Sequence, residues 1–228
     1  MSDVIREALS RAAIYRVLAA AFAYPEPGHA DDVGRAAASA LPWATASVRS
    51  ALAELVAAPA SGDADVLADQ YVALFDGQVA CPPYEGAYGP PRLGGKSMEL
   101  ADIAGFYDAF GMIRTGRQPD ADDHVGAELE FMAALALKQA WALVEGDADR
   151  ARIARDAQRS FFADHLGRWG DAFAIRVQEM APAGFHGTAA RLLAAWLRAE
   201  STLLAVTLVP VAHRAAEDDA PLTCPMAE

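Results

Sequence analysis

The sequence is poor in the features that define several common protein classes. It has only two cysteines, Cys81 and Cys224, which lie far apart in the chain. Two cysteines are too few for a disulfide framework, and these two lack the paired spacing of a zinc site. We therefore expect a chain that folds in a reducing compartment.

Positive charge is also scarce. Lysine and arginine number 19 against 31 aspartates and glutamates, so the formal net charge is -12 at pH 7. A charge of this sign repels phosphate backbones and anionic lipid headgroups. We expect no nucleic acid among the partners of this chain.

Long apolar runs are missing as well. The uncharged stretch 201–213 has 13 residues and contains Pro210, which is short of the roughly 18 residues needed to span a bilayer. Charged residues at Asp3, Arg6 and Glu7 interrupt the beginning of the sequence, so no secretory signal can be drawn there. We expect no membrane insertion and a cytoplasmic location.

The composition that remains is that of a helical globular protein. Hydrophobic residues make up 54% of the 228 residues and charged residues 22%. Alanine alone supplies 54 residues, while valine, isoleucine and threonine never alternate with polar residues over the length of a strand. The sequence predicts an all-α fold, a single compact domain of eight to ten helices over residues 1–211. An acidic, proline-containing tail at 212–228 is expected to be mobile.

Apolar residues at three- and four-residue spacing, together with proline stops, place the helices. The predicted helices span residues 3–24, 31–40, 43–57, 63–75, 97–110, 125–143, 148–165, 168–180 and 187–208. Asp122 or Asp123 is expected to cap the helix that starts near Val125.

A long loop separates the predicted helices on either side of residues 76–95. This segment holds four prolines and five glycines, which forbid a continuous helix. Loops of this length inside a compact chain are either functional or disordered, and Tyr84 and Tyr88 argue against disorder. The tyrosines and the paired prolines, Pro82 and Pro83, would present a rigid amphipathic surface to a peptide. Alternatively, the tyrosines cover the core with their hydroxyls in solvent.

A polar run before residue 125 is the second candidate site. It consists of Asp120, Asp122, Asp123, His124 and Glu128. His124 and Glu128 lie one helical turn apart and would reach one cation, but zinc sites need three or four protein ligands and the run matches no metal signature. Helix capping and a polar cluster for protein binding are the other two interpretations.

Motifs for catalysis are missing. No glycine-rich phosphate loop and no G-x-S-x-G elbow is present, and Cys81 has no histidine near it in sequence to activate it. Tyr71, Leu74 and Phe75 share one helical face, which is either core or the wall of a groove. The residues themselves therefore give no enzyme signature.

Three segments together resemble one family. They are Tyr71–Phe75, Pro82–Tyr88 and Asp123–Met132, and their order and spacing resemble those of the TorD/DmsD/NarJ redox-enzyme maturation chaperones. The segment Phe162–Trp169 is similar to a later part of the same family, so the resemblance runs from about residue 10 to 205. The Cys-Pro-Pro-Tyr-Glu sequence in the loop is most similar to chaperones of type II dimethyl-sulfoxide-reductase-like enzymes.

Two positions depart from the family pattern. Gly86 stands where the family often has serine or threonine, so any hydrogen bond from that hydroxyl is absent. The spacer between Pro119 and His124 is longer than the usual Pro-Asp-His, which changes the expected capping geometry at His124.

The resemblance implies a TorD-like, all-helical chaperone without catalytic turnover or cofactor, as a monomer or homodimer in the cytoplasm. Its partner would be the apo catalytic subunit of a molybdoenzyme, held through the twin-arginine signal peptide or the subunit body until the molybdenum cofactor is inserted. The residues expected to bind this client are Tyr71, Leu74, Phe75, Pro83, Tyr84, Glu85, Tyr88, Asp123, His124 and Glu128. The apolar members would form a groove for the apolar part of the peptide, and the carboxylates would face its arginines.

Two alternatives come from other functional classes. One is a metal-dependent helical enzyme that uses Asp123, His124 and Glu128. The other is a helical scaffold that binds a folded subunit through an exposed apolar patch, with no role for the signal peptide.

Overall fold

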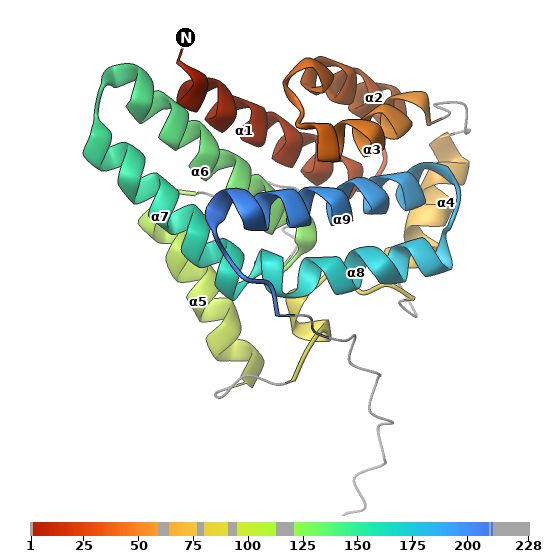
Figure 1. Ribbon diagram of the computed structural model, residues 1–228. Coiled ribbons are helices and arrows are strands. Elements are labelled where there is room, and N and C mark those ends of the chain that lie inside the picture. The colour runs from red at the N-terminus through yellow and green to blue at the C-terminus, as the bar shows by residue number, and fades with distance from the viewer. Residues whose placement is uncertain are drawn as a thin grey trace, which may run out of the picture.

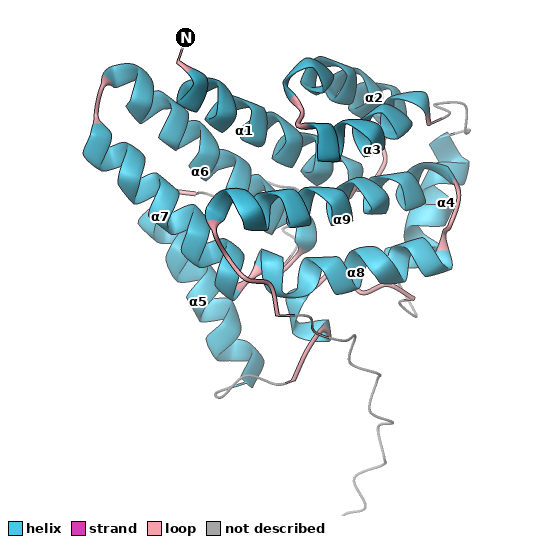
Figure 2. Cartoon of the chain, in the orientation of Figure 1, coloured by secondary structure: helices cyan, strands magenta, loops and turns pink. Residues whose placement is uncertain are grey.

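Helices account for nearly all of the regular structure in the chain. The computed structural model describes residues 2–58, 64–76, 80–90, 95–112, 121–209 and 211. Within these residues there are nine α-helices, two short 3-10 helices and no strand, so the predicted all-α class is confirmed (Figure 2). None of the helices in this part of the chain combines the length and the apolar character needed to cross a membrane. The predicted tail 212–228 lies outside the described residues.

The helices follow the predicted order. The N-terminal ones are α1 (Asp3–Ala21), α2 (His29–Ala40), the 3-10 helix η1 (Leu41–Trp43), α3 (Ala46–Ala57) and α4 (Ala64–Phe75). The loop that follows carries the 3-10 helix η2 (Glu85–Ala87), after which come α5 (Gly95–Ala109), α6 (Val125–Glu145), α7 (Ala148–Asp164), α8 (Leu166–Met180) and α9 (Gly184–Leu204).

Several predicted boundaries are wrong by a few residues, and local backbone geometry explains why. The predicted start of the third helix at residue 43 falls in η1, where Pro42 sits at the start of a tighter turn. The predicted extension of the last helix to residue 208 fails because Ala205 adopts a left-handed conformation, with φ of 52°, and ends α9.

The helices pack around α1. Figure 1 shows α1 between α6 and α7 on one side and α2 and α3 on the other, with α8 and α9 running antiparallel across the front. Alanines such as Ala8, Ala12 and Ala19 form much of the buried side of α1, so neighbouring helix axes can approach closely. The large side chains Tyr15, Leu18 and Phe22 then fill the centre of the core.

A single glycine controls the turn from α8 into α9. A Cβ atom at Gly187 would lie 2.0 Å from the carbonyl oxygen of Ala181, which is far inside van der Waals contact. Because only glycine fits there, the first turn of α9 packs directly against the end of α8.

A buried polar network connects α1 to three other helices. The guanidinium of Arg11 donates to both carboxylate oxygens of Glu200 in α9, with its Nε 3.0 Å from each. The hydroxyl of Tyr15 donates to the same carboxylate at 3.0 Å. Arg11 also reaches Gln139 of α6, which accepts a hydrogen bond from Gln158 of α7. Because a buried charge must be paired, this network fixes the relative positions of the four helices.

Candidate functional site

The end of α4 joins the loop 80–90 through the core. The amide of Cys81 donates to the carbonyl of Leu74 at 2.8 Å, so the loop starts directly against the helix. Phe75 and Tyr88 both contact the ring of Phe173 in α8, with centroid distances of 5.9 and 6.4 Å. The apolar residues of the helix and of the loop therefore form one buried cluster around Phe173.

Tyr88 is held by its hydroxyl as well as by its ring. The hydroxyl donates to the carbonyl of Pro82 at 3.0 Å, and the ring lies 5.2 Å from that of Trp169. Burial raises the pKa of Tyr88 above its ordinary value. The interpretation that places this hydroxyl in solvent is wrong, because the loop folds back and supplies an internal acceptor.

Two backbone hydrogen bonds attach the loop to the start of α6. The amide of Glu85 donates to the carbonyl of Asp123 at 2.9 Å, and the amide of Val125 donates to the carbonyl of Pro83 at 2.8 Å. Segments about forty residues apart in sequence are thereby paired. The first turn of α6 and the loop consequently form a single structural unit.

Glu85 is the centre of a buried ion-pair network. Its Oε2 lies 2.9 Å from Nδ1 of His165, and its Oε1 lies 3.4 Å from Nη1 of Arg168. Arg168 also approaches Glu99 at 3.7 Å, and Nε2 of His165 lies 3.4 Å from Asp102 of α5. The α7–α8 junction thus places the ring nitrogen of His165 and the guanidinium of Arg168 against the loop carboxylate, where an unpaired charge would be very costly.

Glu128 occupies a different environment within the same cluster. Its side chain is fully buried, and its carboxyl accepts the indole N–H of Trp169 at 3.1 and 3.3 Å. Burial raises the pKa of Glu128 well above its ordinary value, and the nearby carboxylate of Glu85 raises it further. The raised pKa favours the neutral carboxylic acid.

His124, rather than an aspartate, caps α6. Its backbone is extended, with φ of -75° and ψ of 139°, and its Nδ1 accepts the amide of Gly126 at 3.1 Å. The predicted caps, Asp122 and Asp123, are therefore wrong, because the helix begins at Val125, one position too late for Asp123 and two too late for Asp122. This bond also requires the neutral tautomer of His124 that carries its proton on Nε2.

The carboxylate of Asp123 turns toward the loop instead. Its Oδ2 accepts the amide of Gly86 at 3.3 Å and lies 3.9 Å from the ammonium of Lys96. A Cβ atom at Gly86 would lie 3.3 Å from the same oxygen, so a serine or threonine there would crowd this carboxylate. The other oxygen, Oδ1, is buried and has no hydrogen-bond partner in the described structure.

Two tyrosines of the predicted set reach the surface. Tyr84 packs edge-on against His124 at 5.4 Å, and the Lys96 ammonium lies 5.9 Å from the Tyr84 ring centroid. Tyr71, on α4, packs in the same way against the exposed Tyr24 at 5.3 Å. The remaining predicted residues are buried: Leu74, Phe75, Pro83, Glu85, Tyr88, Asp123, His124 and Glu128. Ring contacts link Tyr71 to Phe75 and, through Phe173, to Tyr88. The role of the ten residues in client binding stays a prediction.

The donor geometry gives no support to a metal centre. In the part of the chain that the structure describes, no group of three or more histidine, cysteine, aspartate or glutamate side chains is placed to hold a metal ion. Nδ1 of His124 and the carboxyl of Glu128 are already engaged with Gly126 and Trp169. Cys81 is fully buried and its pKa is raised by desolvation to about 11, as expected for a packed thiol.

Sequence reasoning missed the partners of the buried carboxylates. His165, Arg168 and Trp169 stand out in the sequence only as part of the segment that resembles the family, although a histidine, an arginine and a tryptophan within five residues at a helix start are a usable signal. Arg11 was missed as well, and its signal is an arginine on the apolar face between Ala8 and Tyr15. Pairing of such residues with acids elsewhere in the chain depends on tertiary structure.

Comparison with known proteins gives consistent matches. Residues 41–174, which include every residue of the candidate site, match the model of a family described as the nitrate reductase delta subunit. The chain is 28% identical over 144 residues to the chaperone protein TorD of Aeromonas salmonicida (strain A449), covering 63% of each protein. It is 31% identical over 117 residues to the chlorate reductase assembly chaperone protein of Ideonella dechloratans, covering 50% of this chain and 58% of the relative.

These matches cover less than two thirds of the length of either curated relative. A similar fold is found in the crystal structure of a putative redox enzyme maturation protein from Archaeoglobus fulgidus, with a TM-score of 0.50 and 22% identity. That match covers 87% of this chain and 96% of the other. The architecture is therefore shared along almost the whole of both chains.

Proposed function

Because the chain belongs to the nitrate reductase delta subunit family, whose model matches residues 41–174, we propose that it is a cytoplasmic maturation chaperone specific for one molybdoenzyme. It binds the signal peptide, the apo catalytic subunit, or both, of a type II dimethyl-sulfoxide-reductase-like enzyme. It assists folding and insertion of the molybdenum cofactor before twin-arginine export. The observation that carries the proposal is that the matched range contains the whole candidate site.

The buried cluster supports this function by fixing the surface above it. The contacts of Glu85 with His165 and Arg168 hold the loop, and the loop holds Tyr84 at the surface beside the first turn of α6. A tyrosine held in one orientation offers apolar area and a hydroxyl with little loss of conformational entropy on binding. Tyr84, together with Tyr71 and Tyr24 around α4, binds the apolar part of the client peptide in this proposal.

Asp123 is the group proposed to receive an arginine of the client. The Asp123 side chain is only 1% exposed, so a client arginine reaches it once Lys96 moves aside; the Lys96 ammonium is 3.9 Å away and the lysine side chain is 62% exposed. Oδ1 of Asp123 still lacks a hydrogen-bond partner in the described structure. A guanidinium can donate to both carboxylate oxygens at once, which the lysine ammonium does not do here.

The test is recovery of the client by the full-length tagged chain from the native host during anaerobic respiration, followed by mass spectrometry. We expect one molybdoenzyme catalytic subunit, with less of it recovered by Tyr84→Ala. The control is Ile175→Ala, which removes an exposed apolar side chain from α8 outside the site. Recovery of no molybdoenzyme by a folded wild-type bait, with the client genes expressed, overturns the proposal.

A second experiment assigns the part of the client that is bound. The recovered subunit is expressed with and without its twin-arginine signal peptide, and each form is tested against wild type and Asp123→Asn. Loss of binding without the signal peptide, and weaker binding by Asp123→Asn, supports arginine recognition at Asp123. Equal binding of both forms assigns recognition to the subunit body and removes Asp123 from the site. A stoichiometric metal ion in protein purified without chelator would instead favour the metal-enzyme alternative.

A further inference from the structure

One face of α5 carries a regular series of large apolar side chains. They recur at three- and four-residue spacing and are Ile103, Phe106, Tyr107 and Phe110. This is the spacing with which an amphipathic helix anchors in a groove. The opposite face lies in solvent, where Met98 is 62% exposed, and Figure 1 shows α5 at the edge of the molecule beside α7. Within the described residues, α5 is therefore held from one side.

The surface that receives this face is formed by α6 and α7. The ring of Phe106 lies 5.3 Å from that of Phe161 and 5.7 Å from that of His165. The ring of Tyr107 lies 4.8 Å from that of Phe131, which lies 4.7 Å from Phe161. The backbones of α6 and α7 pack far more closely against each other than against α5, so long side chains make the contact with α5. Without α5, the buried rings of Phe131 and Phe161 would form the floor of an apolar groove.

The first turns of α5 contact the candidate site. The ammonium of Lys96 lies 3.9 Å from Oδ2 of Asp123 and 5.9 Å from the ring centroid of Tyr84. Lys96 and Ile103 are seven residues apart, which is two helical turns, so the cation and the apolar series share one face. A cation followed by apolar side chains is also the order proposed for the client signal peptide, with its arginines before its apolar part.

The charged groups around the loop differ in what they would lose if α5 left. Glu85 would keep Arg168 at 3.4 Å and His165 at 2.9 Å, because both come from the α7–α8 junction. Asp123, whose side chain is 1% exposed, would lose the ammonium of Lys96. A buried carboxylate without a counter-charge is costly. The site without α5 therefore calls for a new cation at Asp123 and apolar side chains in the groove.

We propose that α5 is an internal competitor of the client. It fills the groove on α6 and α7 and holds Lys96 at Asp123, and the signal peptide binds by taking the place of both. This inference rests on the proposed function, since it takes the signal peptide as the ligand. The segment that replaces α5 brings an arginine to Asp123 and, about two helical turns further on, apolar side chains to Phe131 and Phe161. Because only molecules with α5 detached bind it, the observed affinity is reduced by their fraction.

Hydrogen exchange of the free chain tests whether α5 detaches. We expect the amides of α5 to exchange through a local opening at least about tenfold faster than those of α6. Phe106→Ala should increase the exchange rate of α5 and leave that of α6 unchanged. Met98→Ala is the control, because it shortens a side chain on the solvent-exposed face of the same helix. Exchange of α5 only by global unfolding, together with α6, overturns the proposal.

The sign of a second effect distinguishes a competitor from a part of the binding site. The probe is the synthetic signal peptide of the recovered client. If α5 competes with it, Phe106→Ala should bind the peptide at least about fivefold more tightly than wild type, because more molecules have α5 detached. Bound peptide should also make the α5 amides exchange faster. Weaker binding by Phe106→Ala, or slower α5 exchange in the complex, overturns the proposal.

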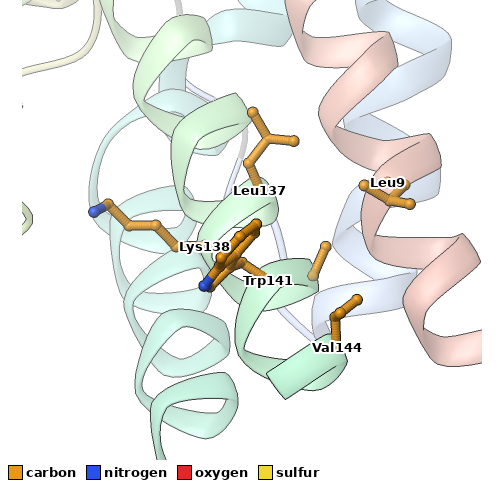
Figure 3. Close-up of a pocket in the computed structure, with 6 residues that line it drawn as sticks. Leu9, Leu137, Lys138, Trp141 and Val144 are labelled. Carbon is orange, nitrogen blue, oxygen red and sulfur yellow. The ribbon is translucent and has the colours of Figure 1, made fainter. Parts of the chain in front are cut away.

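Lys96→Met tests competition at Asp123. We expect it to bind the same peptide about two- to fivefold more tightly, through loss of a partly exposed ion pair. Lys138→Met is the matched control, because it removes the other lysine of the sequence and the same charge. Lys138 lines a shallow cavity of about 350 Å³ between α1 and α6, together with Leu9 and Trp141 and with none of the site residues (Figure 3). Equal affinities of the two variants overturn competition by Lys96.

Failure of this inference is distinguishable from failure of the proposed function. A peptide that binds wild type, and binds Phe106→Ala more weakly, contradicts the role of α5 and leaves signal-peptide recognition standing. A peptide that binds neither wild type nor any of the variants contradicts signal-peptide recognition and the competition with it.

Discussion

At the scale of the single residue, the main finding is that acidic side chains are buried and paired in contrasting ways. Glu85 contacts His165 and Arg168, whereas the contacts of Glu128 within the described residues are the indole N–H of Trp169 and the carboxyl groups around it. The Glu128 carboxyl is thus driven toward its neutral form, whereas Glu85 in the same cluster has a guanidinium beside it. This difference is measurable as a dependence of stability on pH.

Glu128→Gln should be as stable as wild type near pH 4.5 and increasingly more stable than wild type as the pH rises. The folded pKa of Glu128 lies above the ordinary value of 4.5, so the folded protein holds this proton more tightly than the unfolded chain does. Stability is therefore lost as pH rises from the unfolded pKa through the folded one. Glutamine is always neutral, and its carbonyl can still accept from Trp169.

Denaturant unfolding of both proteins across this pH range measures the difference. Glu128→Ala is the contrasting variant, because it leaves the Trp169 indole without an acceptor and opens a cavity, at a cost of about 2–4 kcal/mol. Equal destabilisation by glutamine and alanine would show that the carboxyl is ionised and needed as such.

His186 predicts a loss of stability in mild acid. Burial, together with the smaller effect of the nearby His29 charge, lowers its pKa from 6.5 to about 4. The buried ring packs against Phe75 and Tyr71, and its Nδ1 has no hydrogen-bond partner in the described structure. A depressed histidine pKa stabilises the fold above pH 6.5, and that stability is lost as pH falls toward 4.

Between pH 7.5 and pH 5 the loss attributable to His186 should be about 2 kcal/mol. His186→Phe retains an aromatic ring at this position and should remove that part of the acid sensitivity. The measurement is the free energy of unfolding of both proteins at the two pH values. If the variant and wild type lose equal stability on acidification, the imidazole does not become protonated on unfolding in this range.

At the scale of the helices, burial of Arg11 opposite Glu200 connects the first helix to the last. Replacing either residue alone, by Arg11→Met or Glu200→Met, should cost about 3–5 kcal/mol, because the remaining group is left buried with its main partner gone. The double variant Arg11→Met with Glu200→Met should cost much less than the sum of the single changes. A double-mutant cycle of unfolding free energies tests this, and additive costs would mean that the two side chains act independently.

The helices also show how much of the structure the local sequence pattern predicts. Periodicity and proline stops identified every α-helix of the described structure, because alanine-rich segments with one apolar face have few other conformations available. The cap of α6 was wrong because residues 122, 123 and 124 are all capable of capping, and only the backbone angles of His124 decide among them. The ion pair between α1 and α9 joins residues 189 positions apart, a distance over which periodicity carries no information.

At the scale of the whole molecule, the spacing of residues along a helix does not predict which side of that helix is covered by the rest of the chain. The spacing of Tyr71, Leu74 and Phe75 fits a groove wall as well as a core, because both need one apolar helix face. In the folded chain α8 and α9 cover this face, so Leu74 and Phe75 are buried and Tyr71 lies at the edge. Burial depends on elements a hundred residues further along the chain.

The overall charge makes a separate prediction about the proposed client. With a net charge of -12, the chain should attract a basic signal peptide over long range, and salt should weaken this attraction. We expect affinity for the synthetic signal peptide of the recovered client to fall on the order of tenfold between about 50 and about 500 mM salt. Fluorescence titration measures this affinity. The loss of affinity caused by Tyr84→Ala is expected to be similar at low and at high salt. Affinity that is constant or rises with salt would show that apolar contacts dominate.

Cys81 offers a way to measure when the loop 80–90 separates from α4. Its thiol is fully buried, its amide is bonded to Leu74, and its pKa of about 11 keeps the unreactive protonated form dominant. A thiol reagent must therefore wait for the loop to separate from α4 before it can react. In a Cys224→Ser variant, the labelling rate at Cys81 therefore measures how often the loop opens. A client that inserts under the loop would increase the labelling rate at Cys81, and a client that lies across the closed loop would decrease it.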